Sequence, residues 1–230
     1  MKVELIRMTE NPVEAMANAA RESYNSETDA DKLVRHVLGL RHYSIAEFMD
    51  IHLRISGVSR ALTHQLVRHR HFSFNQRSQR YIDESEFDIV IPESVKNNNL
   101  ANYYFMEALN KIQIAYNESI KAGIPKEDAR YILPNATETI IHFKGNLRSL
   151  IEFFHKRACK RAQWEIRELA TQIKLTISRK LDNEDRFLIN YLTPKCISVG
   201  YCEESKKSCG MRPLKVDVFD YYERYEDLLE

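Results

Sequence analysis

The sequence has 230 residues, of which 43% are hydrophobic and only 12 are Gly or Pro (six of each). This composition excludes a disordered chain and predicts an ordered, compact protein. The apolar stretches fall well short of the ~20 residues that a membrane span needs, and Glu4, Arg7 and Glu10 stand where a signal peptide is apolar. We therefore expect a cytoplasmic protein that has no membrane partner.

The first half of the chain contains clear helix and strand signals. Asn11, Pro12 and Glu14 predict a helix over 11–23, and a second helix is expected over 31–40. Residues 44–47 have the S-x-x-E form of a capping box, and apolar and polar residues then alternate over 49–56, which predicts a half-buried strand. Helical spacing over 59–70 predicts a helix that runs out into a loop.

The second half continues the mixture of helices and strands. A short strand is expected over 87–92, then one long helix from residue 93 to about 121 and a short helix after Pro125. Alternation over 137–144 predicts a further strand, and apolar residues line one face of a helix over 166–177. No linker or repeat divides the chain, so we expect a single domain over 1–230, with a Cys-containing tail at about 190–230. The final run, 217–230, is acidic and is given no function.

The segment 68–81, "RHRHFSFNQRSQRY", is strongly basic. No Asp or Glu lies between Asp50 and Asp83, although six arginines do. Arginine presents a planar set of donors that matches phosphate, and the neighbouring Ser, Asn and Gln side chains can hold a sugar or a base edge. This inventory fits a nucleotide. A solvated basic loop and a single-stranded nucleic-acid site are the alternatives, and the net charge of +1 argues against nucleic acid as a partner.

The order of these residues carries more information than their composition. Residues 68–80 spell R-H-R-x-x-S-x-N-x-x-S-x-R, which resembles the signature of the flavin-dependent thymidylate synthases, the ThyX family. Four other segments resemble the same family and occur in its order: 42–48 (HYSIAEF), 127–134 (EDARYILP), 145–157 (GNLRSLIEFFHKR) and 162–167 (AQWEIR).

The resemblance implies a fold, an assembly and a reaction. The expected fold is α/β of the α+β kind, with a mixed or antiparallel sheet flanked by long helices, assembled into a homotetramer whose active sites are shared between subunits. The implied reaction is methylation of dUMP to dTMP. Methylenetetrahydrofolate supplies the carbon, NADPH reduces FAD, and reduced FAD supplies the hydride. No protein thiol acts as nucleophile in this family, and the signature region contains no Cys.

Position by position, the resemblance also assigns site residues. Those expected at FAD are Ser44, Arg68, His69, Arg70, Asn146, Leu147, Arg148 and Glu152, with Glu47 close by. Those expected at dUMP are Gln65, Leu66, Val67, Arg68, Gln76, Arg77, Ser78, Gln79, Arg80, Arg130 and Arg157.

Arg157 is the predicted catalytic residue. A guanidinium against the uracil edge stabilises the N3 anion and raises electron density at C5, which is otherwise a poor nucleophile. Glu152 departs from the family, in which a neutral residue is common near the flavin. A carboxylate there would repel phosphate unless it pairs with an arginine. Its contact with FAD is therefore the weakest of these assignments.

The tail cysteines have a spacing of C-x5-C-x6-C at Cys196, Cys202 and Cys209. Zinc sites normally show closer pairs and four ligands, so the expectation is no metal, and a zinc site would need Cys159 or another chain to complete it. Two rival functions stay open at this point. A nucleic-acid-binding protein would be colourless and would bind oligonucleotides in a salt-sensitive way, and a flavoprotein that has lost the reaction would bind FAD without turnover.

Overall fold

The computed structural model describes residues 1–24 and 27–218. Most of the acidic run at 217–230 lies outside these residues. The chain forms two compact units that interleave in sequence. The first comprises Met1–Ile6 and His52–Lys144, and the second comprises Arg7–Ile51 and Gly145–Glu230. No helix among the described residues is long and apolar enough to cross a membrane.

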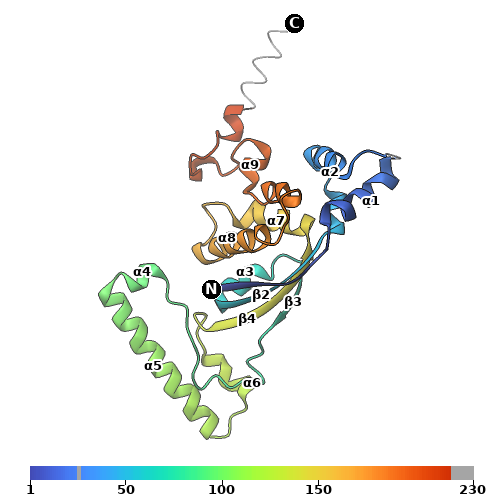
Figure 1. The fold of residues 1–230 in the computed structure, drawn as a ribbon. Helices are drawn as coiled ribbons and strands as arrows, with labels where there is room; N and C mark the ends of the chain where they lie inside the picture. Colours follow the sequence, from blue (N-terminus) through green and yellow to red (C-terminus); the bar gives the residue numbers. More distant parts are fainter. Residues whose placement is uncertain (25–26, 219–230) are drawn as a thin grey trace. The chain divides into compact units, whose positions relative to one another are not determined.

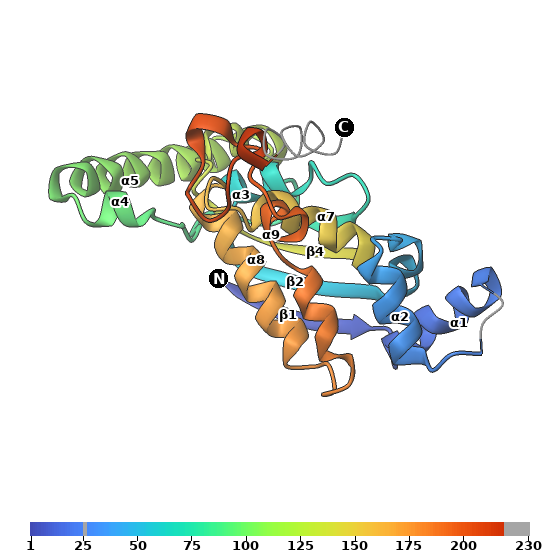
Figure 2. The same ribbon diagram turned by 90° about the horizontal axis from the view of Figure 1, so that it is seen from above.

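A four-stranded sheet holds the first unit together. Its strands are β1 (Lys2–Met8), β2 (Asp50–Ser59), β3 (Ser73–Gln76) and β4 (Glu138–Asn146), in the order β1-β2-β4-β3. Figure 2 shows β1, β2 and β4 side by side. β3 pairs with β4 in antiparallel register, Phe74 opposite Phe143. β2 and β4 also run antiparallel, because Arg60 N donates to Thr137 O at one end and Leu147 N donates to Met49 O at the other.

The alternation predicted for β2 is confirmed. Ile51, Leu53 and Ile55 are buried, whereas His52 and Arg54 between them are half-buried on the opposite face. On that second face His52 Nε2 lies 3.1 Å from His142 Nδ1 of β4, and Arg54 pairs with Glu4 of β1. One face of the sheet therefore supplies apolar core and the other supplies polar contacts.

The helices of the first unit begin and end close to the predicted positions, with one interruption. They are α3 (Arg60–Leu66), α4 (Glu93–Lys96), α5 (Asn99–Lys121) and α6 (Lys126–Ala129), followed by the 3-10 turn η2 (Arg130–Ile132) (Figure 1). The prediction of a single helix over 93–121 is wrong. This region is divided at Asn97 and Asn98, because the Asn98 side chain accepts a hydrogen bond from Ala101 N (3.0 Å) and caps a new helix.

The second unit is mostly helical. It contains α1 (Pro12–Tyr24), α2 (Ala30–Gly39), η1 (Tyr43–Phe48), α7 (Leu147–Arg157), α8 (Trp164–Ser178), η3 (Asp185–Tyr191), α9 (Lys195–Val199) and η4 (Ser205–Lys207). α1 and α2 pack on each other and on η1, and α7 packs on η1, α8 and α9. The predicted helices over 11–23, 31–40 and 166–177 are therefore confirmed.

Three local predictions are wrong. The S-x-x-E segment is not a capping box, since Ser44 lies inside η1 and His42 precedes it without a side-chain cap. Residues 87–92 form only one bridge, Ile89 opposite Thr137, instead of a strand. The segment after Arg70 is not wholly irregular, because it contains β3.

Candidate active site

The signature segment folds as a helix, a turn and a strand. Ser59 is the N-cap of α3, since its hydroxyl accepts from Leu62 N (3.0 Å), and α3 ends at Leu66, two residues before Arg68. Phe72 then anchors the turn, because its ring is buried and lies 4.8 Å from that of Phe143 on β4. Because Phe72 is held in the core, the polar residues just before it lie at the surface with their arginines, and the chain then enters β3.

Two arginines of the turn are available for a ligand. Arg68 and Arg70 are exposed and make no hydrogen bond or ion pair within the described part of the chain, while His69 is half-buried with its ring 6.1 Å from that of Phe72. Guanidinium groups without a carboxylate partner are suited to a phosphate group, which they can bind with two parallel hydrogen bonds.

A second group of arginines surrounds one buried carboxylate. Arg60 donates to the carbonyl of Arg77 (2.9 Å), and Arg77 Nε lies 3.8 Å from the carboxylate of the buried Glu84. Burial lowers the pKa of Arg60, Glu84 opposes that shift, and Arg130 and Arg77 lower the pKa further. The Arg60 Nε is buried without a hydrogen-bond partner among the described residues. Arg60 and Arg77 thus lie near one carboxylate, and Arg130 lies within electrostatic range of Arg60. This concentration of guanidinium groups is suited to an anion.

The remaining signature residues are held by contacts inside the first unit. Arg80 pairs with Glu127 through two nitrogens, Nε at 3.0 Å and Nη2 at 2.8 Å. The Gln76 amide donates to the hydroxyls of Thr63 (3.2 Å) and Thr139 (3.3 Å). The Ser78 hydroxyl accepts from Arg80 N (3.2 Å). These contacts orient the segment, and Glu127 would compete with a bound phosphate for Arg80.

Three residues assigned by the resemblance have buried side chains. Leu66 and Leu147 are in the core, at 0% and 1% exposure, and Gln79 is 7% exposed. Any contact of the two leucines with a ligand would therefore use their backbone. Val67, by contrast, is exposed, and Gln65 is half-buried.

The second unit positions the other predicted FAD residues. Asn146 is the N-cap of α7, and its side-chain oxygen accepts from Ser149 N and Ser149 Oγ, both at 2.9 Å. Arg148, in the first turn of α7, pairs with Glu47 of η1 at 2.6 Å, and its Nε lies 4.0 Å from Glu152. Glu152 thus has an arginine nearby that offsets its charge. Ser44 is exposed on η1.

Arg157 is the last residue of α7 and is half-buried. Burial lowers the pKa of its guanidinium. A guanidinium partly withdrawn from water interacts more strongly with a developing negative charge than a fully solvated one does, because the local dielectric is lower. This environment suits the role predicted for it.

The predicted site residues therefore fall into two groups. Gln65 to Arg70, Gln76 to Arg80 and Arg130 lie in the first unit, while Ser44, Asn146 to Arg148, Glu152 and Arg157 lie in the second. Both groups combine arginines with neutral hydrogen-bonding side chains, which is the donor set that a flavin dinucleotide and a nucleotide phosphate need.

Comparison with known proteins agrees with this donor set. The sequence matches the family "Thymidylate synthase complementing protein" (Thy1) over residues 4–181. It is 36% identical over 91% of its length to a flavin-dependent thymidylate synthase of Clostridium tetani, covering 93% of that protein. The chain belongs to the flavin-dependent thymidylate synthase family. A second relative of the same name, from Pyrococcus furiosus, is 40% identical over 89% of this chain and 90% of its own.

Solved structures of this family have the same fold. The ThyX of Helicobacter pylori, determined with FAD and dUMP, superposes with a TM-score of 0.69 at 23% identity, covering 84% of this chain and 99% of the other. The mixture of helices with an antiparallel sheet, expected from the family resemblance, is thereby confirmed.

Sequence reasoning missed three residues of the candidate site. Arg60 was counted among the arginines of the basic segment but was not assigned to a ligand. The signal that could have found it is that no Asp or Glu lies near it in the sequence. Glu84 and Glu127 were not considered, although Glu127 stands in the EDAR segment three residues before Arg130. Carboxylates that pair with site arginines are hard to recognise in sequence, because the pairing joins residues far apart in the chain.

Proposed function

We propose that this chain converts dUMP to dTMP as a flavin-dependent thymidylate synthase, with methylenetetrahydrofolate as carbon donor and NADPH as reductant. The observation that carries the proposal is the intact signature at residues 68–80 within a family match that spans residues 4–181. The arrangement of arginines described above supports it, because the substrate and the cofactor are both phosphorylated.

FAD fits the residues that the chain offers. Arg68 and Arg70 would hold its pyrophosphate, while Ser44, His69, Asn146, Leu147 and Arg148 would provide the remaining contacts. When bound, FAD supplies the hydride that reduces the transferred one-carbon unit to a methyl group. Glu152 lies 4.0 Å from Arg148, so its charge is partly offset before any phosphate arrives. Glu152 then acts by orienting Arg148 more than by touching the cofactor.

The dUMP phosphate would be held by Ser78 and Arg80, with Gln65 to Arg68, Gln76, Arg77, Gln79 and Arg130 around the nucleotide. Arg80 already has a fixed orientation, because Glu127 holds two of its nitrogens. Binding of the phosphate would replace part of this ion pair with a stronger interaction, since a phosphate carries more negative charge than a carboxylate.

Arg157 would bind the uracil edge. Its half-buried guanidinium would stabilise the ring with N3 ionised, and the electron density that this places on C5 would let C5 attack the one-carbon unit. No cysteine takes part in this step, and the four cysteines of the chain all lie at residue 159 or beyond, none of them in the signature segment.

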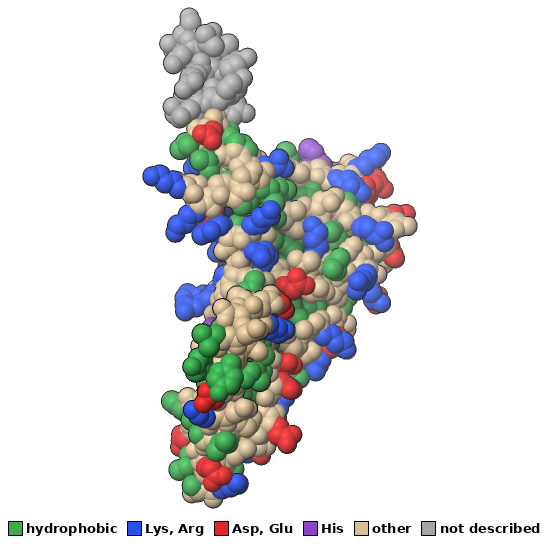
Figure 3. Space-filling view, turned by 90° about the vertical axis from the view of Figure 1, so that its left-hand side faces the viewer, with side chains coloured by type: hydrophobic (Ala, Val, Ile, Leu, Met, Phe, Trp, Pro, Cys, Tyr) green, Lys and Arg blue, Asp and Glu red, His purple; other side chains and the backbone are tan. Residues whose placement is uncertain are grey.

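We further propose a homotetramer with active sites shared between subunits. One observation supports an assembly of copies. α5 exposes a row of apolar side chains, namely Leu100, Tyr103, Tyr104, Met106 and Ile114, at 37–66% exposure. Figure 3 shows hydrophobic side chains gathered over α5 in its lower half. Apolar patches of this kind mark interaction surfaces. The cytoplasmic location stays a prediction.

The test is formation of dTMP by the purified chain. We expect dTMP from dUMP only when FAD is bound and NADPH and methylenetetrahydrofolate are present, so that removal of the flavin or omission of either co-substrate should stop it. If the protein binds FAD but makes no dTMP, the flavoprotein that has lost the reaction becomes the better account. Salt-sensitive binding to oligonucleotides by a protein that takes up no FAD would favour the nucleic-acid alternative.

A further inference from the structure

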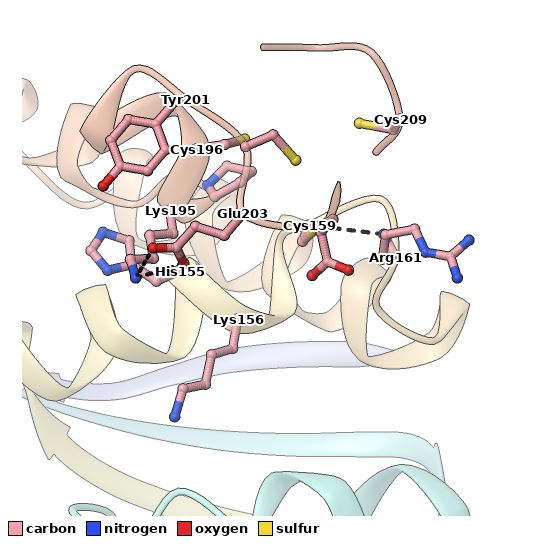
Figure 4. A pocket seen from close by; sticks show the side chains of 12 residues that line it. His155, Lys156, Cys159, Arg161, Lys195, Cys196, Tyr201, Glu203 and Cys209 are labelled. Atoms are coloured by element: carbon pink, nitrogen blue, oxygen red, sulfur yellow. Dashed lines mark hydrogen bonds and ion pairs between the residues drawn. The ribbon is translucent and has the colours of Figure 1, made fainter. Parts of the chain in front are cut away.

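All four cysteines of the chain line one pocket of about 340 Å³ in the second unit. Cys159 follows the end of α7, while Cys196 lies in α9, Cys202 in the bridge to Leu214, and Cys209 in the loop after η4. None of the four is in a disulfide. Figure 4 shows the sulfur of Cys209 directed toward the part of the pocket where Cys159 and Cys196 lie.

The tail that carries three of these thiols has almost no core of its own. Among residues 193–218, Cys202 is the one buried side chain, at 6% exposure. The backbone is nevertheless ordered into a closed loop, because Cys202 N donates to Pro213 O (2.7 Å) and Lys215 N donates to Cys202 O (3.0 Å). Short segments that cannot bury enough apolar surface usually depend on a disulfide or a metal ion.

The local backbone brings the thiols toward one another. Gly200 ends α9 with φ of +92°, and Gly210 follows Cys209 with φ of +77°, so the chain turns sharply between Cys196 and Cys202 and again beside Cys209.

Four thiols around one space match the preference of Zn²⁺ for tetrahedral sulfur ligands. The C-x5-C-x6-C spacing of the tail is wider than that of common zinc motifs, and the structure supplies the missing fourth ligand from Cys159. Among the residues that the structure describes, no three His, Cys, Asp or Glu are already closed around an ion position. Binding must therefore draw the thiols together, which is open to Cys209 because it is exposed on a loop beside a glycine.

We propose that Cys159, Cys196, Cys202 and Cys209 bind one Zn²⁺ ion as thiolates and that this ion fastens the tail to the end of α7. The ion releases the thiol protons to solvent on binding and needs no oxidant. Because α7 ends at Arg157, two residues before Cys159, the ion would also limit movement of the helix end that carries the predicted catalytic arginine. The inference does not depend on the proposed function, since metal content is measured without substrate.

The first experiment measures the metal in the full-length protein, purified with a non-thiol reductant. We expect one zinc per chain by elemental mass spectrometry. Replacement of the zinc by Co²⁺ should give the intense visible bands of a tetrahedral thiolate site. A reduced protein that contains no zinc and develops no such bands would overturn the proposal, as would disulfides among these cysteines found by mass spectrometry after alkylation.

The second experiment removes one ligand. The zinc affinity of each variant is measured by competition with a chelating dye. Loss of a group that only hydrogen-bonds to a ligand lowers metal affinity about 10- to 100-fold. Cys209→Ser removes a ligand itself and should lower the affinity by more than this. Lys207→Ser, an exposed neighbour, is the matched control and should bind zinc normally. The rate at which trypsin cleaves the tail gives a second readout. In the control, a chelator should raise this rate. In Cys209→Ser, the rate should be equally fast with and without the chelator. Equal zinc affinity in the two variants would contradict the proposal.

Discussion

At the scale of single residues, Arg157 is the side chain on which the proposed chemistry depends most. Arg157→Ala removes one preorganised charge that stabilises the transition state, and the expected loss is about 10²- to 10³-fold in kcat. Binding of FAD should be retained, as judged by the visible spectrum. Arg179→Ala, at an exposed arginine after α8, should turn over normally. If both variants lose activity equally, or neither does, the catalytic role of Arg157 is wrong.

Glu84 gives a prediction about pH. Burial raises its carboxyl pKa despite the opposing effect of Arg77 and Arg60. A carboxyl whose pKa is higher in the folded than in the unfolded chain contributes stability below the unfolded pKa and loses it as pH rises through the folded pKa. Glu84→Gln cannot ionise, so its melting temperature relative to wild type should rise between pH 4.5, the ordinary pKa, and neutrality.

Thermal melts across this pH range test the prediction. Glu118→Gln, at an exposed position on α5, controls for the general loss of one negative charge. The difference between Glu84→Gln and wild type should change with pH more than the difference for the control does. A constant difference over the range would show that ionisation of Glu84 in the folded protein has no such cost.

At the scale of elements, Asn146 is the N-cap of α7 and is also proposed to bind FAD. Asn146→Ala removes the N-cap, which should cost about 1 kcal/mol, or roughly 2–4 °C in melting temperature for a chain of this size. Asn146→Ser can restore the cap but not the amide. If Asn146 holds FAD, Asn146→Ser should therefore recover stability and still bind FAD more weakly by equilibrium titration.

The matched control for Asn146 lies at the start of α5. Asn98→Ala removes an equivalent cap, whose side chain accepts from Ala101 N at 3.0 Å, at a position with no predicted ligand contact. It should lower the melting temperature by a similar amount and leave FAD affinity unchanged. Weaker FAD binding in Asn98→Ala as well would mean that loss of stability alone explains the effect.

The same elements show what could be predicted from the sequence. Helices with strong local signals, such as α1 with its Pro12 start and α8 with its apolar face, lie within a few residues of the expected positions. The break at Asn97 and Asn98 was missed although the sequence contains a signal for it, because asparagine favours helix caps and turns over helix interiors. β3 was missed because it has four residues, mostly polar, and exists through its pairing with β4, which is far away in the sequence.

The candidate site was predictable to a similar degree. Residues 68–80 could be identified because the signature is contiguous, and Arg68 and Arg70 are exposed there. Their contact with a ligand stays a prediction. The pairs Arg80–Glu127 and Arg77–Glu84, and the position of Cys159 beside the tail cysteines, depend on tertiary contacts, so no local pattern could reveal them.

At the scale of the whole molecule, the apolar face of α5 predicts assembly. Light scattering should find four chains per particle in the wild type. Replacing Tyr104 and Ile114 together with Glu should give smaller particles, because burying two new carboxylates is unfavourable. Arg179→Glu, at an exposed position after α8 and not part of this face, is the control and should keep the wild-type mass. An unchanged mass in the double variant would exclude this face as an interface.

The central claim is that the chain uses a bound flavin to methylate dUMP. The most direct measurement is the visible absorption spectrum of the purified protein, recorded without oxygen before and after addition of NADPH with dUMP. We predict a flavin spectrum that bleaches on addition and returns when methylenetetrahydrofolate is added, together with formation of dTMP. A protein that stays colourless after incubation with FAD would contradict the account.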